Sequence, residues 1–269
     1  MYADYHIHSN FSPDGHDTME AICRHAIRIG LDEIALTDHF ELYPPGFPDP
    51  DPYFQASLLD DYEAEVRRVQ VQFKGRLRVV LGIEMGQPHE DLALSSKLVS
   101  SHGFDYVLGS IHKLRDKDLG VVSYEDETEL STRILEDLTA LWELADKADY
   151  DCLAHVDIIR RYAAYYGRPI DFMDYPDALT RLLRRVIERG KGLEINTSGL
   201  RQPVRDTLPF TEVLRLYRSL GGEIVTLGSD AHGLDDIGAG FSIAREALIE
   251  AGFCHIARYR NRTPIFCPI

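Results

Sequence analysis

Short apolar runs alternate with segments of helical spacing along almost the whole chain. Seven runs end in a polar side chain, and they cover residues 3–8, 33–39, 79–84, 106–112, 152–155, 193–196 and 224–232. Between them, apolar residues recur three and four positions apart, which predicts helices over 18–29, 57–73, 91–101, 127–148, 174–189, 210–220 and 237–251. Glycine follows several of these segments, as at Gly30 and Gly103, and suits the left-handed residue that ends a helix.

This alternation, with strands as continuously apolar as 79–83, predicts an α/β fold in which helices cover a parallel sheet. A doubly wound open sheet gathers ligands at one switch point, whereas polar residues here end nearly every strand. A barrel brings all its strand ends to one mouth. We therefore predict a barrel of seven strands, with 256–259 as a candidate eighth, and residues 1–269 as one domain.

Two stretches interrupt the pattern. Residues 40–53 contain five prolines and are not expected inside a strand or helix. Because they follow His39, they should overhang the mouth, either as a semi-rigid lid or substrate wall or as a surface crossover. Residues 161–172 are predicted to be irregular and carry several tyrosines.

Composition narrows the class of protein. Hydrophobic residues make up 44% and charged residues 27%, as in soluble globular proteins. The chain shows neither a basic and apolar leader nor an apolar stretch of membrane-spanning length, so we expect a cytoplasmic protein without membrane contact. Its four cysteines form no Cys-x-x-Cys pair, which disfavours a disulfide framework or a structural zinc knuckle.

The formal net charge of −15 argues against a nucleic-acid partner, because phosphate-backbone binding needs a concentrated basic face. A small anionic substrate is still compatible with this charge, because bound divalent cations reverse the local field at a site. The sequence does not indicate an oligomeric state.

The polar strand ends are rich in potential metal ligands. His6 and His8 are two residues apart on a predicted strand, so their side chains share one face. A single histidine is more often a packed or capping residue, but turns seldom recruit histidine repeatedly, so the shared placement favours ligation. Nine side chains are candidates: His6, His8, Asp14, His39, Glu84, His112, His155, Asp230 and His232. Imidazole and carboxylate donors suit two or three zinc, manganese or iron ions.

The remaining histidines are assigned other roles. His25, His102 and His255 lie in or beside predicted helices and are expected to be structural. His89 follows Glu84 closely and is interpreted as a surface residue of a loop, with substrate contact as the alternative.

These motifs resemble the polymerase-and-histidinol-phosphatase (PHP) superfamily across nearly the whole chain. The matching segments are 6–8 with Asp14, 37–39, 82–84, 109–112, 154–155 and 228–232. More narrowly, 155–157 followed by 160–162, together with 193–201, look like the histidinol-phosphate phosphatase branch.

The resemblance implies a distorted (β/α)7, TIM-like barrel of PHP type with a trinuclear centre. It assigns His6, His8, Glu84 and Asp230 to the first metal, and Glu84, His112 and His155 to the second. The third metal takes Asp14, His39 and His232, with Asp14 at a position that is His in some PHP proteins. Glu84 is thus the expected bridge.

The expected chemistry is hydrolysis of a small phosphate monoester. Paired ions neutralise phosphate oxygens and lower the pKa of bound water, so a metal-bridging hydroxide is predicted to attack phosphorus. Arg160 and Arg201 are the predicted phosphate contacts, with Arg161 and Arg205 as weaker alternates. Asn196 and Ser198 are expected to orient substrate or ligands. The proton for the leaving alcohol is expected from Asp14, His16, Asp157, His232 or water.

The leading function is hydrolysis of L-histidinol phosphate in L-histidine biosynthesis. One alternative is a PHP phosphoesterase that acts on nucleotides, oligonucleotide ends or phosphotyrosine. A noncatalytic metal-binding regulatory module and a metal-dependent amidohydrolase are the other hypotheses. The complete ligand set disfavours the former, and the paired arginines disfavour the latter.

Overall fold

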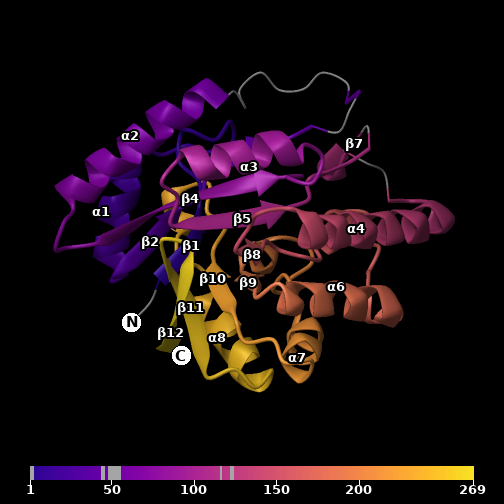
Figure 1. Ribbon diagram of the computed structural model, residues 1–269. Coiled ribbons are helices and arrows are strands. Elements are labelled where there is room, and N and C mark those ends of the chain that lie inside the picture. The colour runs from indigo at the N-terminus through magenta and orange to yellow at the C-terminus, as the bar shows by residue number, and fades with distance from the viewer. Residues whose placement is uncertain (1–2, 44–45, 48–55, 116, 122–123) are drawn as a thin grey trace.

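The parallel strands form a nearly closed barrel in the computed structural model, which describes residues 3–43, 46–47, 56–115, 117–121 and 124–269 (Figure 1). The strand order is β1-β2-β4-β5-β8-β9-β10, and the short β3 pairs with β4. The bounds are Ala3–Ile7 (β1), Glu33–Leu36 (β2), His39–Glu41 (β3), Arg78–Gly86 (β4), Tyr106–Ser110 (β5), Cys152–Leu153 (β8), Gly192–Asn196 (β9) and Val225–Gly228 (β10). A parallel bridge between Ile7 and Ala231 connects the two ends of the sheet. The predicted seven-stranded barrel is confirmed.

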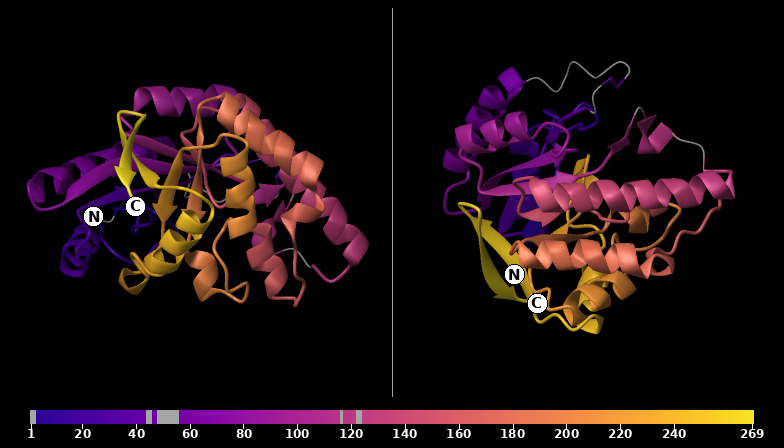
Figure 2. Two further views of the ribbon diagram at one scale, coloured as in Figure 1. Left: turned by 90° about the horizontal axis from the view of Figure 1, so that it is seen from below. Right: turned by 45° about the vertical axis from the view of Figure 1, so that its right-hand side comes forward.

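Helices surround the barrel on its outer face (Figures 1 and 2). They are Met19–Ile29 (α1), Ala56–Gln72 (α2), Leu92–Ser101 (α3), Glu127–Lys147 (α4), Ile159–Ala164 (α5), Pro176–Glu188 (α6), Thr211–Ser219 (α7) and Phe241–Glu250 (α8). Side chains of Thr18, Asp91 and Asp126 accept backbone N–H groups and fix the first turns of α1, α3 and α4. None of the helices in the described part of the chain has the length and apolarity to cross a membrane.

Strand β1 contains a bulge that serves both the core and the mouth. Asp4 pairs with Ile34, whereas Ile7 pairs with Leu36, so β1 carries one extra residue between these pairs. Tyr5 consequently joins the apolar cluster inside the barrel, while Ile7 packs in the outer core beneath the helices. A bulge is a usual way to redirect side chains near a site.

The C-terminal hairpin plugs the end of the barrel where the strands begin. Its strands β11 (His255–Arg260) and β12 (Thr263–Pro268) pair antiparallel and stand apart from the main sheet. The Tyr106 ring centroid lies 5.1 Å from that of Tyr5 and 4.8 Å from that of Tyr259. The Tyr259 backbone N–H donates to the Tyr5 hydroxyl at 2.7 Å. Residues 256–259 therefore form a strand, but not an eighth barrel strand.

The expectations about the two irregular stretches need correction. Residues 40–41 lie in β3 although the proline-rich stretch was expected to be irregular, because β4 is long enough to pair with them. Within that stretch, 44–45 and 48–53 lie outside the described residues, so the lid hypothesis remains a prediction. Residues 161–164 belong to α5, and a 3₁₀ turn at Phe172–Asp174 precedes α6, which starts at Pro176 because proline suits the first helical position.

Candidate metal centre

Glu84 lies at the centre of the barrel mouth, at the carboxyl end of β4, and is fully buried. Five imidazoles surround its carboxylate. His6 Nε2, His8 Nε2 and His39 Nδ1 lie 3.3, 3.6 and 2.8 Å from Oε2, and His112 Nε2 and His155 Nε2 lie 3.3 and 2.9 Å from Oε1. One carboxylate thus faces five nitrogen donors from four places in the barrel, namely β1, β3 and the segments that follow β5 and β8.

Asp230 adds a second carboxylate on the β10 side of the mouth. Its Oδ1 lies 3.7 Å from His6 Nε2 and 3.4 Å from His8 Nε2. The backbone φ of Asp230 is 54°, a left-handed conformation that aspartate adopts more readily than most residues. This backbone turn places the carboxylate beside the histidines of β1.

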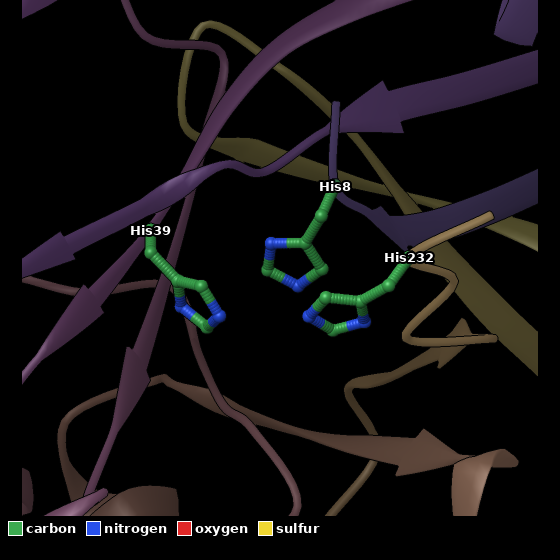
Figure 3. Close-up of side chains that lie close together, drawn as sticks. All are labelled: His8, His39 and His232. Carbon is green, nitrogen blue, oxygen red and sulfur yellow. The ribbon is translucent and has the colours of Figure 1, made fainter. Parts of the chain in front are cut away.

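A third group lies nearer the surface. The rings of His8, His39 and His232 converge from the ends of β1, β3 and β10, and Figure 3 shows them facing a common space. The His8 ring lies 4.2 Å from His39 and 4.2 Å from His232 between centroids. Asp14 lies beside this group, with oxygens 3.2 Å from His232 Nε2 and 3.8 Å from His39 Nε2.

Several inward-facing atoms lack ordinary partners. His6 Nε2, His8 Nε2 and Glu84 Oε2 are buried and have no hydrogen-bond partner among the described residues. Four compact sets of donors overlap around them, namely His6–His8–Asp230, His6–Glu84–His155, His39–Glu84–His112 and His8–His39–His232. Buried polar atoms without partners are costly in an apolar core, so this donor set fits bound cations. Asp14 lies just outside these sets.

Partners on the far side of each ring fix which nitrogen faces inward. His6 Nδ1 lies 2.7 Å from Glu194, and His112 Nδ1 lies 2.6 Å from Glu41. His8 Nδ1 lies 3.1 Å from the Ser12 hydroxyl, which itself donates to Asp38. If Nδ1–H donates to these groups, Nε2 is left with a lone pair toward the centre, which is the usual arrangement of metal-binding histidines.

Glu41 and Glu194, the carboxylates behind His112 and His6, were not predicted from the sequence as supporting residues. Glu41 also accepts from Gln87 Nε2 at 2.8 Å and from Lys113 Nζ at 2.9 Å, so its position is held from three sides. Glu194 accepts from the His155 backbone N–H at 3.1 Å and from Asn196 Nδ2 at 3.0 Å. Asn196 therefore lies in the supporting layer of the centre, through Glu194.

Two glycines make room for these carboxylates. A Cβ on Gly228 would collide with Glu194 Oε1, and would lie 2.6 Å from the His6 Cβ. A Cβ on Gly86 would likewise collide with both carboxylate oxygens of Glu41. Any larger residue at either position forces the supporting carboxylate to move.

The charges of the cluster are strongly coupled. Burial disfavours ionised Glu84, but His6, His112 and His39 outweigh it and hold the pKa of Glu84 well below its usual range. Burial, reinforced by His232 and His39, lowers the pKa of His8 well below its usual range. An ionised carboxylate and a neutral imidazole are the forms that coordinate metal.

The mouth opens into a cavity of about 270 Å³, near the lower end of typical ligand pockets. Beyond the candidate ligands, its walls include Glu41, Lys113, Asp118, Ile158, Arg161 and Tyr162. Arg161 Nη1 lies 3.4 Å from Asp230 Oδ2, and Arg161 Nη2 donates to the Tyr162 hydroxyl at 2.8 Å. Arg161 thus brings a cation to the wall of the candidate centre.

The predicted phosphate contacts Arg160 and Arg201, and Asn196, are not among the residues that line this cavity in the described chain. Arg160 pairs with Asp157 and Asp206, both at 3.1 Å, and its guanidinium lies 4.2 Å from the Phe210 ring centroid. Arg201 donates to the Ser229 carbonyl at 2.8 Å and pairs with Asp236. His16 and His89 are also absent from the lining, and the His89 side chain is only 6% exposed.

A family model described as "PHP domain" matches residues 4–198, which contain most of the barrel and most of the histidine cluster. The chain belongs to this family. Among curated relatives, "Histidinol-phosphatase" of Lactococcus lactis is 29% identical over 95% of this chain and 93% of the relative. "Probable histidinol-phosphatase" of Clostridium acetobutylicum is 30% identical over 95% of both chains.

A solved structure extends the similarity to three dimensions. The crystal structure of histidinol phosphate phosphatase from Lactococcus lactis, complexed with zinc, L-histidinol and phosphate, superposes with a TM-score of 0.82 at 28% identity. The match covers 98% of each chain. The overall fold is therefore shared over nearly the full length of the two proteins.

Proposed function

We propose that this chain is a histidinol-phosphatase, which hydrolyses L-histidinol phosphate to L-histidinol and inorganic phosphate in L-histidine biosynthesis. The observation that carries the proposal is the ring of five imidazoles around buried Glu84, next to a cavity that also contains an arginine. Relatives that bear this name match nearly all of the chain, which supports the choice of substrate within the family.

The nine candidate ligands are proposed to hold two or three zinc, manganese or iron ions, with Glu84 between them. Zinc in the solved relative supports zinc as one occupant. When bound, such ions neutralise phosphate oxygens and lower the pKa of water, so that water attacks phosphorus near neutral pH. Asp14, which is 57% exposed, is proposed as the most peripheral ligand, and His232 beside it as a candidate proton donor to the leaving alcohol.

Arginines are proposed to bind the phosphate because a guanidinium matches its oxygens with paired donors. Arg161 is supported by its place in the cavity wall, since its side chain is 19% exposed and lies beside Asp230. Arg201 is supported by a buried Nη1 without a partner among the described residues, which leaves a donor for a ligand. Arg160 remains a predicted contact, although carboxylates already occupy its guanidinium.

The test is steady-state hydrolysis of L-histidinol phosphate beside a nucleotide, a 5′-phosphorylated oligonucleotide and phosphotyrosine, with metal content measured on the same preparation. We expect histidinol phosphate to have the highest kcat/KM and chelation to abolish its turnover. Faster hydrolysis of another substrate class would assign the chain to a different PHP phosphoesterase. Binding of phosphate esters by the metal-loaded protein without release of phosphate would indicate a regulatory module.

A variant of Glu84 and a matched control test whether this carboxylate is shared between the metal ions. Glu84→Ala removes the carboxylate that faces five imidazoles, so both metal content and turnover should fall together. Glu246→Ala changes an exposed residue on α8 and should leave both unchanged. Normal metal content and activity in Glu84→Ala would contradict the proposed centre.

A further inference from the structure

Part of the cavity wall consists of residues that are not among the proposed ligands of metal or phosphate. Asp118, Lys113 and Tyr162 line the cavity beside the candidate ligands, and Asp118 and Lys113 belong to the small hairpin of β6 (Lys113–Leu114) and β7 (Lys117–Asp118). The Asp118 side chain lines the cavity and is 40% exposed, so a ligand can approach it. Its Oδ1 accepts the Gly120 backbone N–H at 2.7 Å, which fixes the orientation of the carboxylate.

Lys113 does not fully neutralise Asp118. Its Nζ donates to Glu41 at 2.9 Å, while Asp118 Oδ2 lies 3.6 Å away, beyond an ordinary hydrogen bond. The Lys113 ammonium thus lies between two carboxylates and makes the shorter contact with Glu41. Among the described residues Lys113 is the partner of Asp118 Oδ2, and at this distance Oδ2 can still accept a hydrogen bond from a ligand.

An aromatic ring lies next to this carboxylate. A Cβ placed on Gly120 would be 3.1 Å from Asp118 Oδ1 and 3.3 Å from Tyr162 Cε1, so the two side chains flank the same point of the backbone. Arg161 holds the Tyr162 hydroxyl, and its guanidinium carbon lies 4.9 Å from the ring centroid. The ring is therefore fixed in place beside the carboxylate.

A carboxylate beside an aromatic ring is a typical environment for an organic cation. We propose that Asp118, assisted by Tyr162, binds the cationic part of the substrate, an ammonium or imidazolium group, while the metal ligands and Arg161 hold its phosphate. This inference rests on the proposed function and adds a residue that determines specificity. It explains why a cavity suited to an anion also carries an exposed carboxylate on its wall.

The experiment compares two esters in wild type and Asp118→Asn. L-Histidinol phosphate carries the cation, whereas 4-nitrophenyl phosphate carries none. Asparagine keeps the acceptor for the Gly120 N–H and removes only the charge, so folding and metal content should be preserved. We expect kcat/KM for histidinol phosphate to fall by about tenfold or more through KM, equivalent to about 1.4 kcal/mol, and kcat/KM for 4-nitrophenyl phosphate to stay within about twofold.

Inhibition gives a second readout, with 4-nitrophenyl phosphate as the reporter substrate. L-Histidinol should inhibit wild type and should inhibit Asp118→Asn more weakly, whereas inhibition by inorganic phosphate should be equal in both. Tyr162→Leu should weaken inhibition by L-histidinol in the same direction. Glu125→Gln, an exposed change close in sequence to the same hairpin, is the matched control and should behave as wild type.

Equal losses on both esters would overturn the proposal, because Asp118 would then act on the metal centre through Lys113 and Glu41. Unchanged kinetics on histidinol phosphate would overturn it as well. If wild type hydrolyses only 4-nitrophenyl phosphate, the proposed function fails. The cation site is then decided by the inhibition assay alone, and it is rejected if L-histidinol does not inhibit wild type.

Discussion

Glu194 Oε1 lies 2.7 Å from His6 Nδ1, and both side chains are completely buried. The two residues are 188 positions apart in the chain and meet because β9 and β1 flank β10 in the barrel. A carboxylate behind a histidine fixes its tautomer and raises its basicity toward metal. Glu194 thus fixes the orientation of the His6 ring in the candidate centre.

Glu194→Gln tests this support. Glutamine keeps the shape of the side chain and removes its charge, so His6 should remain in place but bind metal more weakly. We expect a loss of about 10- to 100-fold in metal affinity or activity. Metal titration by competition with a chelator, beside the exposed control Glu246→Gln, measures it; equal affinity in both variants would exclude a supporting role.

Gly228→Ala tests the space beneath the same pair. The added methyl would collide with Glu194 and crowd the His6 Cβ, so the variant should lose about 1–3 kcal/mol of stability and much of its metal. Gly233→Ala is the control, because a Cβ there would approach only Asp17, at 3.9 Å. Urea unfolding and metal analysis report the two effects, and wild-type values for Gly228→Ala would refute the steric argument.

Arginine variants separate phosphate binding from structural support. In Arg161→Ala, KM for histidinol phosphate should rise about tenfold with little change in stability, because the guanidinium faces the cavity. In Arg160→Ala, the larger effect should be on stability, since Asp157 and Asp206 lose their partner. A larger rise of KM in Arg160→Ala than in Arg161→Ala would instead support the contact predicted from sequence.

Asp137 on α4 predicts a pH dependence that does not involve the metal centre. It is buried, and neither carboxylate oxygen has a hydrogen-bond partner among the described residues. Burial, with a smaller contribution from Asp157, raises the pKa of Asp137 well above its usual range. The folded chain therefore holds a proton that the unfolded chain releases, so this group makes the free energy of unfolding fall as pH rises from about 3.9 through the raised pKa.

Asp137→Asn should remove this loss. The free energy of unfolding of the variant should exceed that of wild type by about 1–3 kcal/mol near pH 8, and the difference should shrink toward about pH 4. Urea unfolding across this pH range, with the exposed Asp61→Asn as control, measures the difference. A constant difference at all pH values would show that Asp137 is not protonated in the folded chain.

The order of strands and helices, and most candidate ligands, followed from the amino-acid sequence. Parallel strands in a barrel point the same way, so residues that end successive apolar runs must meet at one mouth whatever the details of packing. Glu84, Asp230 and the histidines could be named for this reason. The predicted starts of α1 and α3 were also close to the observed ones, because Thr18 and Asp91 cap these helices through local contacts.

Only the tertiary structure decided what stands behind and beside those ligands. Glu194 and Glu41 pair with His6 and His112 across 188 and 71 positions, so no local pattern marks them as partners. Arg160 and Arg161 are neighbours on α5, where each step turns the side chain by roughly 100°, so packing determines which one reaches the cavity. Local spacing specifies elements and their ends, whereas the register between strands and the rotation of each helix depend on the whole core.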